Sequence, residues 1–338
     1  MRASLSASGI QALIGEDLGE RAGVQYTELT PRRLLNHCDT PRMPDCWTIN
    51  PYRGCSLGCR YCYARYTHEF LGLSDPLAFE RQIFVKAGAP QVLAAEATER
   101  KLRARPIAIG TVTDPYQPAE AKYELTRGIL EVLAGYRGLD VGIVTKSALI
   151  TRDLDLLGHL HSRSRLHIAV SLITPYRKLA RKLDPGAPTP ERRLKTVQAL
   201  ADAGLDVGIN ALPILPEIND STRDLGLLFR RARAYGASWI CVGPLFLASG
   251  SRRRFLDWLG EELPEKLPAY RRMFARGMDV DPRWARSLEL RVAGLRRAIG
   301  LPEGRARGRE PAEIQLALPG IASGPGRPQP VGALNSSP

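Results

Sequence analysis

Hydrophobic positions along the middle of the chain form short runs that alternate with longer stretches of helical periodicity. The short runs are rich in β-branched residues and apolar at successive positions, as expected of strands buried on both faces of a parallel sheet. They are WTINPY (47–52), IFVK (83–86), PIAIGTV (106–112), DVGIVTK (140–146), LHIAVSL (166–172), DVGINALPI (206–214) and WICVGPL (239–245).

The stretches between these runs predict helices. The clearest is PTPERRLKTVQALADAG, in which Thr189 can cap the helix, Pro190 occupies its first position and Gly204 ends it. Alternation of strands with helices of crossover length predicts an α/β fold, either a βα barrel or an open doubly wound sheet. The predicted helices cover residues 60–71, 90–103, 120–135, 151–161, 190–203 and 221–235.

Both ends of the chain differ from this alternating body, which covers residues 43–250. Residues 1–42 are predicted to be a loop-rich N-terminal arm with helical fragments at most. From Arg252 the pattern is helical only, so residues 251–302 are predicted to form a helical C-terminal extension that caps the sheet domain. Residues 303–338 are rich in Pro, Gly, Ala and Ser and are predicted to be a disordered tail.

The composition fits a globular protein of a reducing compartment. The chain has 338 residues and 44% hydrophobic content, enough for one large domain with extensions. Its longest apolar run, WICVGPLFLA (239–248), is far shorter than the roughly 20 residues that cross a bilayer, and the N-terminus lacks the pattern of a signal peptide. Six cysteines do not make a secreted disulfide scaffold. We therefore expect a cytoplasmic protein with no membrane partner.

A net charge of +13 directs attention to anionic partners. The excess is spread over the body of the chain and is not carried by a tail. A polyanion, nucleic acid first, suits such a balance. An Arg-rich solvated surface would give the same charge, and no basic stripe with interleaved aromatic residues is visible.

Candidate chemistry is concentrated in NPYRGCSLGCRYCYAR (50–65), where Cys55, Cys59 and Cys62 follow the spacing C-x3-C-x2-C. Clustered thiols in a reducing compartment indicate metal ligands. Soft ligands close together on a loop suit a [4Fe–4S] cluster held by three thiolates. One iron would then have no protein ligand and could bind a small molecule directly.

Other interpretations of the three thiols remain open at this point. A structural zinc would need a fourth ligand, which His68, Cys38 or Cys46 could supply, but no second knuckle of paired ligands exists. A catalytic zinc seldom has an all-thiolate shell. A redox C-x2-C motif belongs to a smaller, thioredoxin-like unit. Cys38, Cys46 and Cys241 are widely separated in sequence, and we expect each to be a buried structural residue.

The C-x3-C-x2-C spacing, with Tyr61 directly before the third cysteine, resembles the signature of the radical S-adenosylmethionine (SAM) superfamily. In that superfamily the loop follows the first strand of a partial (β/α)6 TIM-like barrel, and here WTINPY leads into RGCSLGC. The resemblance implies that Cys55, Cys59 and Cys62 bind three irons, that SAM chelates the fourth, and that Tyr61 lies near the adenine. It also implies reductive cleavage of SAM to methionine and a 5′-deoxyadenosyl radical, with an electron donor such as flavodoxin or ferredoxin.

In a barrel of this type the carboxyl ends of the strands face the site. In IGTVTDPYQPAE, Thr113, Asp114 and Glu120 stand where superfamily members bind the SAM amino group, although helix capping would use the same residues.

Three later strand ends extend the predicted set. Lys146 is a candidate for the SAM carboxylate, with a snorkelling surface lysine as the alternative. Ser171 and Asn210 are candidates for the ribose hydroxyls. Pro213 and Ile214 would give the adenine an apolar wall, and core packing explains them equally well.

Longer phrases narrow the resemblance. NPYRGCSLGCRYCYAR, TDPYQPAE, VTKS, LDPGAP and FLDWL are similar to the bacterial radical SAM proteins grouped with spore photoproduct lyase as "DNA repair photolyase" relatives. This implies hydrogen-abstraction chemistry on a nucleic-acid substrate. The lyase carries a hydrogen-donor cysteine near the end of the strand before its Asp-containing loop, and Thr111 stands about there in this chain. The difference disfavours direct reversal of a thymine dimer, unless Cys241 supplies the hydrogen atom from the last strand. A non-catalytic nucleic-acid-binding protein stabilised by zinc or a cluster is the alternative function.

Overall fold

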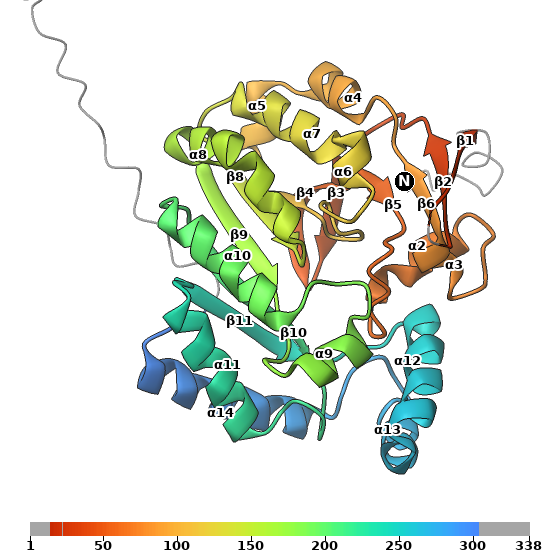
Figure 1. Cartoon of the computed structure of the whole chain (residues 1–338), viewed down its shortest axis with the longest axis vertical. Helices are drawn as coiled ribbons and strands as arrows, with labels where there is room; N and C mark the ends of the chain where they lie inside the picture. The colour runs from red at the N-terminus through yellow and green to blue at the C-terminus, as the bar shows by residue number, and fades with distance from the viewer. Residues whose placement is uncertain (1–13, 22, 304–338) are drawn as a thin grey trace, which may run out of the picture.

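The computed structural model describes residues 14–21 and 23–303 (Figure 1). Its centre is a curled sheet of seven strands in the order β11-β10-β9-β8-β7-β4-β3, with helices around its outer face. The six strands from β11 to β4 run parallel, and β3 pairs antiparallel with β4 at the edge. The predicted partial (β/α)6 barrel is therefore confirmed. The strands are β3 (Asn36–Thr40), β4 (Met43–Ile49), β7 (Ile107–Ile109), β8 (Asp140–Thr145), β9 (Arg165–Ser171), β10 (Val207–Ile214) and β11 (Trp239–Pro244).

A second, four-stranded sheet corrects two predictions. Its order is β1-β2-β6-β5, with bounds Ile14–Arg21, Val24–Leu29, Gln82–Val85 and Tyr52–Arg53. The predicted arm thus contains strands where loops and helical fragments were expected. The run IFVK lies in this small sheet and not in the parallel one, because β6 pairs with β2 and β5. Partners so distant in sequence leave no local pattern.

The predicted helices form the outer layer, but the one predicted over 90–103 is divided at Ala97 and Thr98, which are extended, into α4 and α5. In α10, Thr189 accepts a hydrogen bond from the backbone N–H of Arg192, as a capping residue should. The helix predicted over 120–135 is broken at Glu124, which has a φ of +49°. These helices are α4 (Ala89–Glu96), α5 (Glu99–Arg103), α6 (Glu120–Tyr123), α7 (Leu125–Ala134), α8 (Leu154–Arg163), α10 (Pro190–Asp202) and α11 (Thr222–Ala234).

Short helical segments connect these elements. The helix predicted over 60–71 is reduced to a 3-10 turn and a single α-turn, and the helix predicted to begin at residue 151 is preceded by a 3-10 segment. Two further short helices were not predicted. The segments are η1 (Tyr63–Arg65), α2 (Tyr66–Glu69), α3 (Ala78–Arg81), η2 (Ala148–Asp153) and α9 (Arg177–Leu183).

The two faces of the large sheet differ in residue size. Ile109, Ile143 and Ile168 point to the outer face and pack in the main core with the surrounding helices. The inner face carries small residues in register, such as Ala169 paired with Gly208. A Cβ added to Gly208 would lie 2.1 Å from the Trp239 ring, so glycine makes room for this indole.

A polar cluster lies at the amino end of the strands, below that indole. Asp206 accepts hydrogen bonds from Trp239 Nε1 at 3.0 Å and Ser238 Oγ at 2.7 Å, and it lies 2.5 Å from His167 Nδ1. These packed side chains occupy the amino end of the barrel. The carboxyl end is left for the site.

The C-terminal region is helical, as predicted. Leu288 and Val292 of α14 pack in the same core as α11, while Phe255 and Trp258 of α12 pack beside the cysteine loop. The chain then returns to the sheet, where Ile240 donates a hydrogen bond to the Pro302 carbonyl at 3.2 Å. The helices are α12 (Ser249–Glu262), η3 (Pro264–Lys266), α13 (Leu267–Met273) and α14 (Pro282–Ile299).

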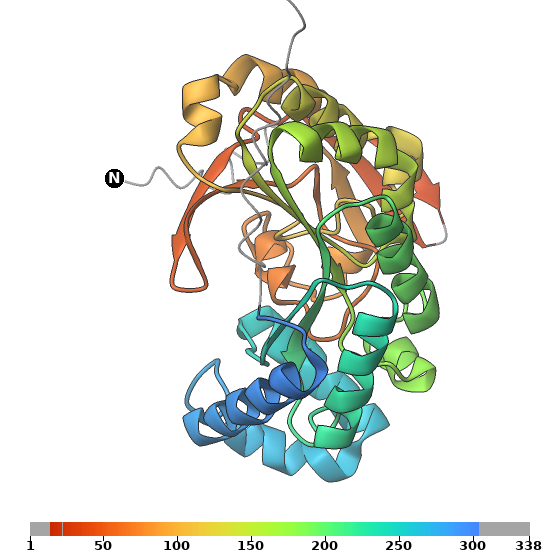
Figure 2. The ribbon, with the colours of Figure 1, turned by 90° about the vertical axis from the view of Figure 1, so that its left-hand side faces the viewer.

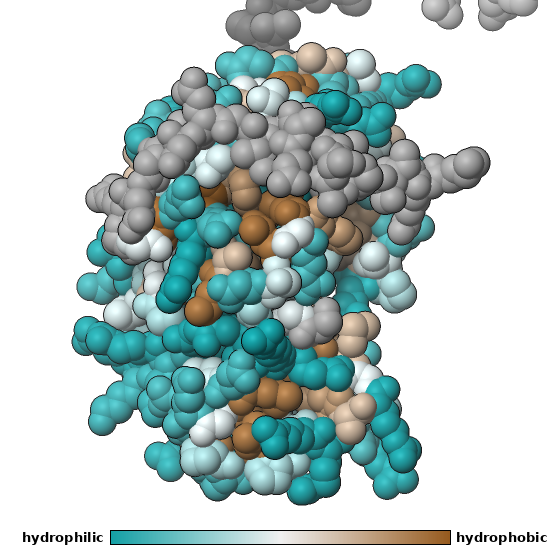
Figure 3. Space-filling view, turned by 90° about the vertical axis from the view of Figure 1, so that its right-hand side faces the viewer, coloured by the Kyte–Doolittle hydropathy of each residue, from teal (hydrophilic) through white to brown (hydrophobic). Residues whose placement is uncertain are grey.

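The predicted domain boundaries stay predictions, and the predicted tail, except for Glu303, lies outside the described residues. None of the described helices is long and apolar enough to cross a membrane. The β3–β4 hairpin projects from the body of the molecule in Figure 2. On the face shown in Figure 3, hydrophilic residues predominate and hydrophobic surface is divided into separate patches.

Candidate functional site

The three clustered cysteines lie at the carboxyl end of β4, on the loop that follows β5. Cys55 and Cys59 are buried, Cys62 is half-buried, and all three are thiols. Burial raises the pKa of Cys55 to about 12 and that of Cys59 well above its usual value. Buried thiols ionise only beside positive charge, which a metal centre supplies. Three soft sulfur donors on one loop therefore fit an iron–sulfur cluster.

The residues weighed for a zinc site are arranged differently. His68 is buried, and its Nε2 lies 2.9 Å from the Gln82 carbonyl. Burial lowers the pKa of this histidine to about 4. Within residues 14–21 and 23–303, no three His, Cys, Asp or Glu side chains are placed to share one metal ion.

Gln117 and Thr113 hold the first half of the cysteine loop. The Gln117 side chain accepts a hydrogen bond from the Ser56 N–H at 3.0 Å and donates one to the Gly54 carbonyl at 3.1 Å. Thr113 Oγ1 donates to the same carbonyl at 2.6 Å. Gln117 is fully buried, so its amide replaces water for backbone groups on both sides of Cys55.

The end of α9 and the segment after it hold the second half of the loop. The Arg60 N–H donates to the Leu183 carbonyl at 2.9 Å, and the Gly186 N–H donates to the Leu57 carbonyl at 3.0 Å. A Cβ at Gly186 would lie 2.8 Å from the Ser56 carbonyl oxygen. Only glycine permits this close approach. The phrase LDPGAP is therefore a structural clamp on the cysteine loop.

A buried ionic network lies next to Cys59. The Tyr61 hydroxyl donates to Asp184 at 2.6 Å, and Arg193 donates to the other oxygen of that carboxylate at 2.9 Å. Lys146 Nζ lies 5.7 Å from the centre of the Tyr61 ring. Burial raises the pKa of Asp184, but the cations Lys146 and Arg193 outweigh it and lower the pKa below its usual value.

The same charges act on Lys146. Burial lowers the pKa of this amine, but Cys59 and Asp184 outweigh burial, so that the pKa is raised above its usual value. Lys146 is half-buried next to the predicted adenine neighbour Tyr61. A lysine on the open surface would be neither half-buried nor next to Tyr61.

Asp114 and Glu120 are engaged by the protein itself. Asp114 accepts hydrogen bonds from the Thr145 hydroxyl at 2.6 Å and from the Lys146 N–H at 2.7 Å, which tie the loop after β7 to the end of β8. Glu120 is fully buried and accepts from the Tyr52 hydroxyl at 2.6 Å and from Arg152 at 2.9 Å. None of these contacts tests whether Asp114 and Glu120 bind SAM, so that role stays a prediction.

A row of inward-facing residues crosses the carboxyl half of the sheet. Ser171 on β9 is in register with Asn210 on β10, which is in register with Cys241 on β11. Their neighbours Val170, Ile209 and Ile240 point into the outer core, so the row faces the barrel interior. Among the described residues, the Ser171 and Asn210 side chains have no hydrogen-bond partner. Ile214 lies in the outer core, whereas Pro213 is half-buried.

Thr111 occupies the position at which a cysteine that donates a hydrogen atom was considered. Its hydroxyl accepts a hydrogen bond from Asn50 Nδ2 at 3.0 Å, and its carbonyl accepts one from the Tyr63 hydroxyl. Tyr63 directly follows Cys62, so Thr111 lies beside the cysteine loop. The side chain at this position contains no thiol.

The β3–β4 hairpin corrects one expectation about the remaining cysteines. Cys38 and Cys46 are eight positions apart in sequence, yet they are directly opposite each other in the antiparallel pair. Cys241 lies on the far edge strand. The three were expected to be buried, which is confirmed for Cys46, whereas Cys38 and Cys241 are half-buried.

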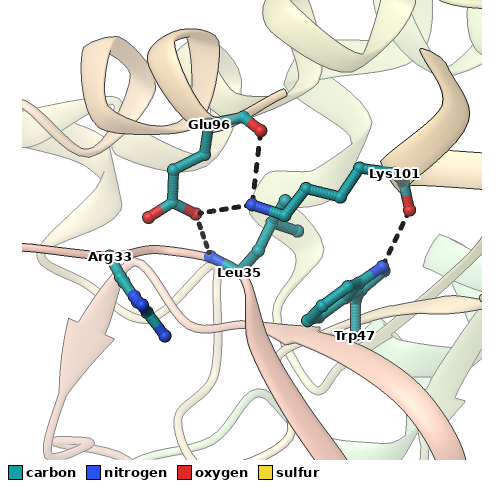
Figure 4. Close-up of a pocket in the computed structure, with 5 residues that line it drawn as sticks. All are labelled: Arg33, Leu35, Trp47, Glu96 and Lys101. Atoms are coloured by element: carbon teal, nitrogen blue, oxygen red, sulfur yellow. Dashed lines mark hydrogen bonds and ion pairs between the residues drawn. The ribbon is translucent and has the colours of Figure 1, made fainter. Parts of the chain in front are cut away.

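A cavity of about 390 Å³ lies away from this constellation. It is lined by Arg33, Leu35, Trp47, Glu96 and Lys101, with Glu96 bonded to the Leu35 N–H and to Lys101 (Figure 4). The backbone N–H of Trp47 donates to the Pro106 carbonyl, which lies just before β7. The cavity is therefore at the amino end of the strands. The cysteine loop lies at the opposite end.

The structure thus brings Cys55, Cys59, Cys62, Tyr61 and Lys146 together. It places Ser171 and Asn210 on the inner face of the sheet, in the carboxyl half. Sequence reasoning did not assign roles to Gln117, Asp184 or Arg193. The phrases TDPYQPAE and LDPGAP contain Gln117 and Asp184 and were the signal available, but only the folded chain gives their partners. Arg193 Nη2 is buried without a hydrogen-bond partner among the described residues.

The sequence of the chain matches a known protein family and several relatives. The sequence profile of the Radical SAM superfamily matches residues 49–226. An uncharacterized protein of Mycobacterium bovis is 37% identical over 274 residues, which cover 81% of this chain and 80% of the relative. An uncharacterized protein of Methanocaldococcus jannaschii is 25% identical over 58% of this chain and 70% of its own length.

Solved structures of one enzyme share the fold. Spore photoproduct lyase complexed with dinucleoside spore photoproduct has a TM-score of 0.61 at 16% identity and covers 89% of this chain and 88% of its own. A mutant of that lyase with bound AdoMet and dinucleoside spore photoproduct has a TM-score of 0.60 over the same shares of the two chains. At this identity the likeness establishes the fold alone.

Proposed function

The chain belongs to the radical SAM superfamily, and on that premise we propose that Cys55, Cys59 and Cys62 hold a [4Fe–4S] cluster for reductive cleavage of SAM. The single observation that supports this best is the cysteine loop itself. Its three thiols stand at the carboxyl end of the first parallel strand and are clamped from two distant segments. When bound, the cluster and SAM supply a 5′-deoxyadenosyl radical that removes a hydrogen atom from the substrate.

The residues around the loop have distinct tasks in this proposal. Lys146 binds the SAM carboxylate, because its cationic amine lies beside Tyr61 at the end of β8. Ser171 and Asn210 bond the ribose hydroxyls, since their side chains face the interior and have no hydrogen-bond partner in the part of the chain that the structure describes. Tyr61 supports the adenine side of the site while its hydroxyl stays on Asp184.

Thr113, Asp114 and Glu120 are proposed on the amino-group side of SAM. Their contacts favour a positioning role. Thr113 holds the Gly54 carbonyl, and Asp114 fixes the backbone of Lys146. The Glu120 carboxylate already accepts hydrogen bonds from Tyr52, Arg152 and two backbone N–H groups, so only its remaining acceptor capacity is left for SAM.

For the substrate we propose a nucleic acid. The net charge of +13 supports a polyanion, and structural relatives hold a dinucleoside lesion. Thr111 lies beside the cysteine loop where a thiol donor was considered, and a threonine O–H bond is too strong to replace a thiol S–H as hydrogen-atom donor. The reaction therefore ends differently from thymine-dimer reversal, unless Cys241, from the same inward-facing row as Asn210, donates the hydrogen atom.

The test begins with anaerobic reconstitution of the full chain. We expect about four irons and four sulfides per chain, and formation of 5′-deoxyadenosine and methionine after reduction in the presence of SAM. Well-loaded protein that forms no 5′-deoxyadenosine, while a known radical SAM enzyme does so in parallel, would contradict the proposal. One zinc per chain would instead support a non-catalytic, metal-stabilised nucleic-acid-binding protein.

The substrate class is tested by isotope transfer. Deuterated oligonucleotides or nucleosides are incubated with the loaded enzyme, SAM and a reductant such as reduced flavodoxin. Deuterium in 5′-deoxyadenosine identifies the position attacked. If 5′-deoxyadenosine forms but stays unlabelled with every deuterated nucleic acid, SAM cleavage stands and the nucleic-acid substrate is wrong.

A further inference from the structure

The β3–β4 hairpin contains a pair of thiols that the proposed SAM chemistry does not use. Cys38 on β3 and Cys46 on β4 are directly opposite in the antiparallel register. Opposite residues in such a pair have Cα atoms about 4.5 or 5.5 Å apart. Both values fall within the range of about 4.4–6.8 Å that disulfides span. The backbone therefore already has the spacing of a cross-strand disulfide.

The side chains of the pair point to one face. Trp47 packs against the outer core, so Cys46 and the opposite Cys38 point to the inner face of the sheet. On that side, burial and the neighbouring Cys38 both raise the pKa of Tyr66 on α2. The pair thus lies over the segment that follows the cysteine loop.

Exposure distinguishes the two thiols. Cys38 is half-buried on β3, which is the edge strand of the sheet, whereas Cys46 is 6% exposed on the covered strand β4. A thiol on an edge strand is accessible to small molecules in solvent, and its thiolate can attack a small disulfide. An adjacent buried thiol can then attack the mixed disulfide that results. Both residues are thiols in the structure.

The turn of the hairpin that carries this pair also contacts residues beyond the opposite edge of the sheet. At the turn between the two strands, Arg42 stacks on the Phe246 ring at 4.2 Å and forms an ion pair with Asp279. Phe246 and Asp279 lie beyond β11, the opposite edge of the sheet. The turn therefore connects the two edges of the open barrel, and a covalent bond between Cys38 and Cys46 would fix the strands that carry it.

We propose that Cys38 and Cys46 form a redox-active dithiol site that exchanges with small-molecule disulfides of the glutathione class. The Cys38 thiolate attacks one sulfur of the oxidised disulfide, forms a mixed disulfide and releases one small thiolate. The Cys46 thiolate then attacks Cys38 Sγ, which closes the cross-strand disulfide and releases the second small thiol. Two protein thiols are oxidised, and one small disulfide is reduced to two thiols.

The test uses the sequence around the hairpin. Trypsin cleaves after Arg33, Arg42 and Arg53, so Cys38 and Cys46 fall on separate peptides, 34–42 and 43–53, with one cysteine each. The anaerobically purified full chain is equilibrated with mixtures of reduced and oxidised glutathione, alkylated, digested and analysed by mass spectrometry. We expect a linked 34–42/43–53 peptide, lighter by two hydrogen atoms than its two parts, with concerted loss of alkylation at both cysteines.

Variants separate the proposed pair from general oxidation. Cys241→Ser should leave the linked peptide unchanged, whereas Cys38→Ser, at the half-exposed position, should abolish it and leave Cys46 alkylatable. Full alkylation of both wild-type cysteines at every glutathione ratio would overturn the proposal. So would linkage of Cys38 to Cys55, Cys59 or Cys62 in place of Cys46. This readout does not depend on SAM cleavage.

Discussion

At the scale of single residues, the clearest feature is how little of the cysteine loop is left to water. Each half of the loop is held by hydrogen bonds from another segment, and two of its three thiols are buried. The spacing C-x3-C-x2-C predicts the three thiols as donors because ligands on one loop leave a local pattern, and this assignment stays a prediction. Gln117 and Asp184 were not predicted as supports because their contacts cross 61 and 123 residues of sequence.

Cys59→Ala tests the donor set. Loss of one of three thiolates should abolish both cluster loading and 5′-deoxyadenosine formation, since the remaining two sulfurs cannot hold the cluster. Iron and sulfide analysis together with product chromatography measures both. Cys241→Ala is the matched control and should retain normal iron content. An intact, SAM-cleaving cluster in Cys59→Ala would show that the ligand assignment is wrong.

Gln117→Leu tests the support of the loop. It leaves the Ser56 N–H and one bond of the Gly54 carbonyl unmatched in a buried region, and we expect a loss of about 1–3 kcal/mol of unfolding free energy. Urea unfolding measures the loss, and iron content after reconstitution should fall with it. Gln91→Leu on the exposed side of α4 is the control, with both quantities unchanged. Wild-type stability in Gln117→Leu would remove the argument for this clamp.

At the scale of elements, local periodicity predicted those elements whose own residues carry the apolar spacing or the capping signal. The helix beginning at Pro190 and the six parallel strands follow from apolar spacing and capping residues. It failed for β1 and β2, which form a hairpin where loops and helical fragments were expected. It also assigned the predicted strand IFVK to the wrong sheet, because β6 pairs with β2 across more than fifty residues of sequence. It also failed at Glu124, where a positive φ splits one predicted helix into two.

The ends of β9, β10 and β11 meet in the polar cluster around Asp206, which gives the barrel a pH dependence. Burial raises the pKa of Asp206, but hydrogen bonds from His167, Ser238 and Trp239 outweigh it and lower the pKa below its usual value. A carboxyl group whose pKa is lowered by folding adds stability above its unfolded pKa of about 3.9 and loses it as the pH falls through the folded pKa.

Asp206→Asn should therefore cost about 1–3 kcal/mol at pH 7, because three donors lose a charged acceptor. The difference from wild type should shrink as the pH falls below about 4 and through the lowered folded pKa, where the wild-type carboxylate becomes protonated. Urea titrations across this range measure it. Asp202→Asn, at the exposed end of α10, should match wild type throughout. A difference that stays constant with pH would exclude the carboxylate as its origin.

At the scale of the whole molecule, the sheet order leaves β11 and β3 as the two edges of an open barrel. Chain segment 301–303 covers β11, and the β3–β4 hairpin forms the other edge. The curled parallel sheet followed from the alternation of strands and helices. Which strand would be excluded from it, and which edge would be covered, depends on contacts between parts of the chain that no window of sequence contains.

The charge of the whole molecule gives the last prediction. If the substrate is nucleic acid, a chain with a net charge of +13 should retain an oligonucleotide at low salt and release it as salt rises. Each phosphate contact contributes about 0.9 to the slope of log affinity against log salt for duplex DNA, and about 0.7 for single strands. Fluorescence anisotropy through a salt series measures this slope. Binding that does not change with salt would argue against phosphate recognition.

The two clamps on the cysteine loop also set an order of events during synthesis. All three thiols leave the ribosome early, but the Asp184 that receives the Tyr61 hydroxyl is made 123 residues later. Until then the loop can have the clamp from Thr113 and Gln117 but lacks the second clamp and the burial that the later segment provides. We therefore expect iron delivery to follow translation of the barrel, so that the cell must keep three exposed thiols reduced and metal-free on the growing chain.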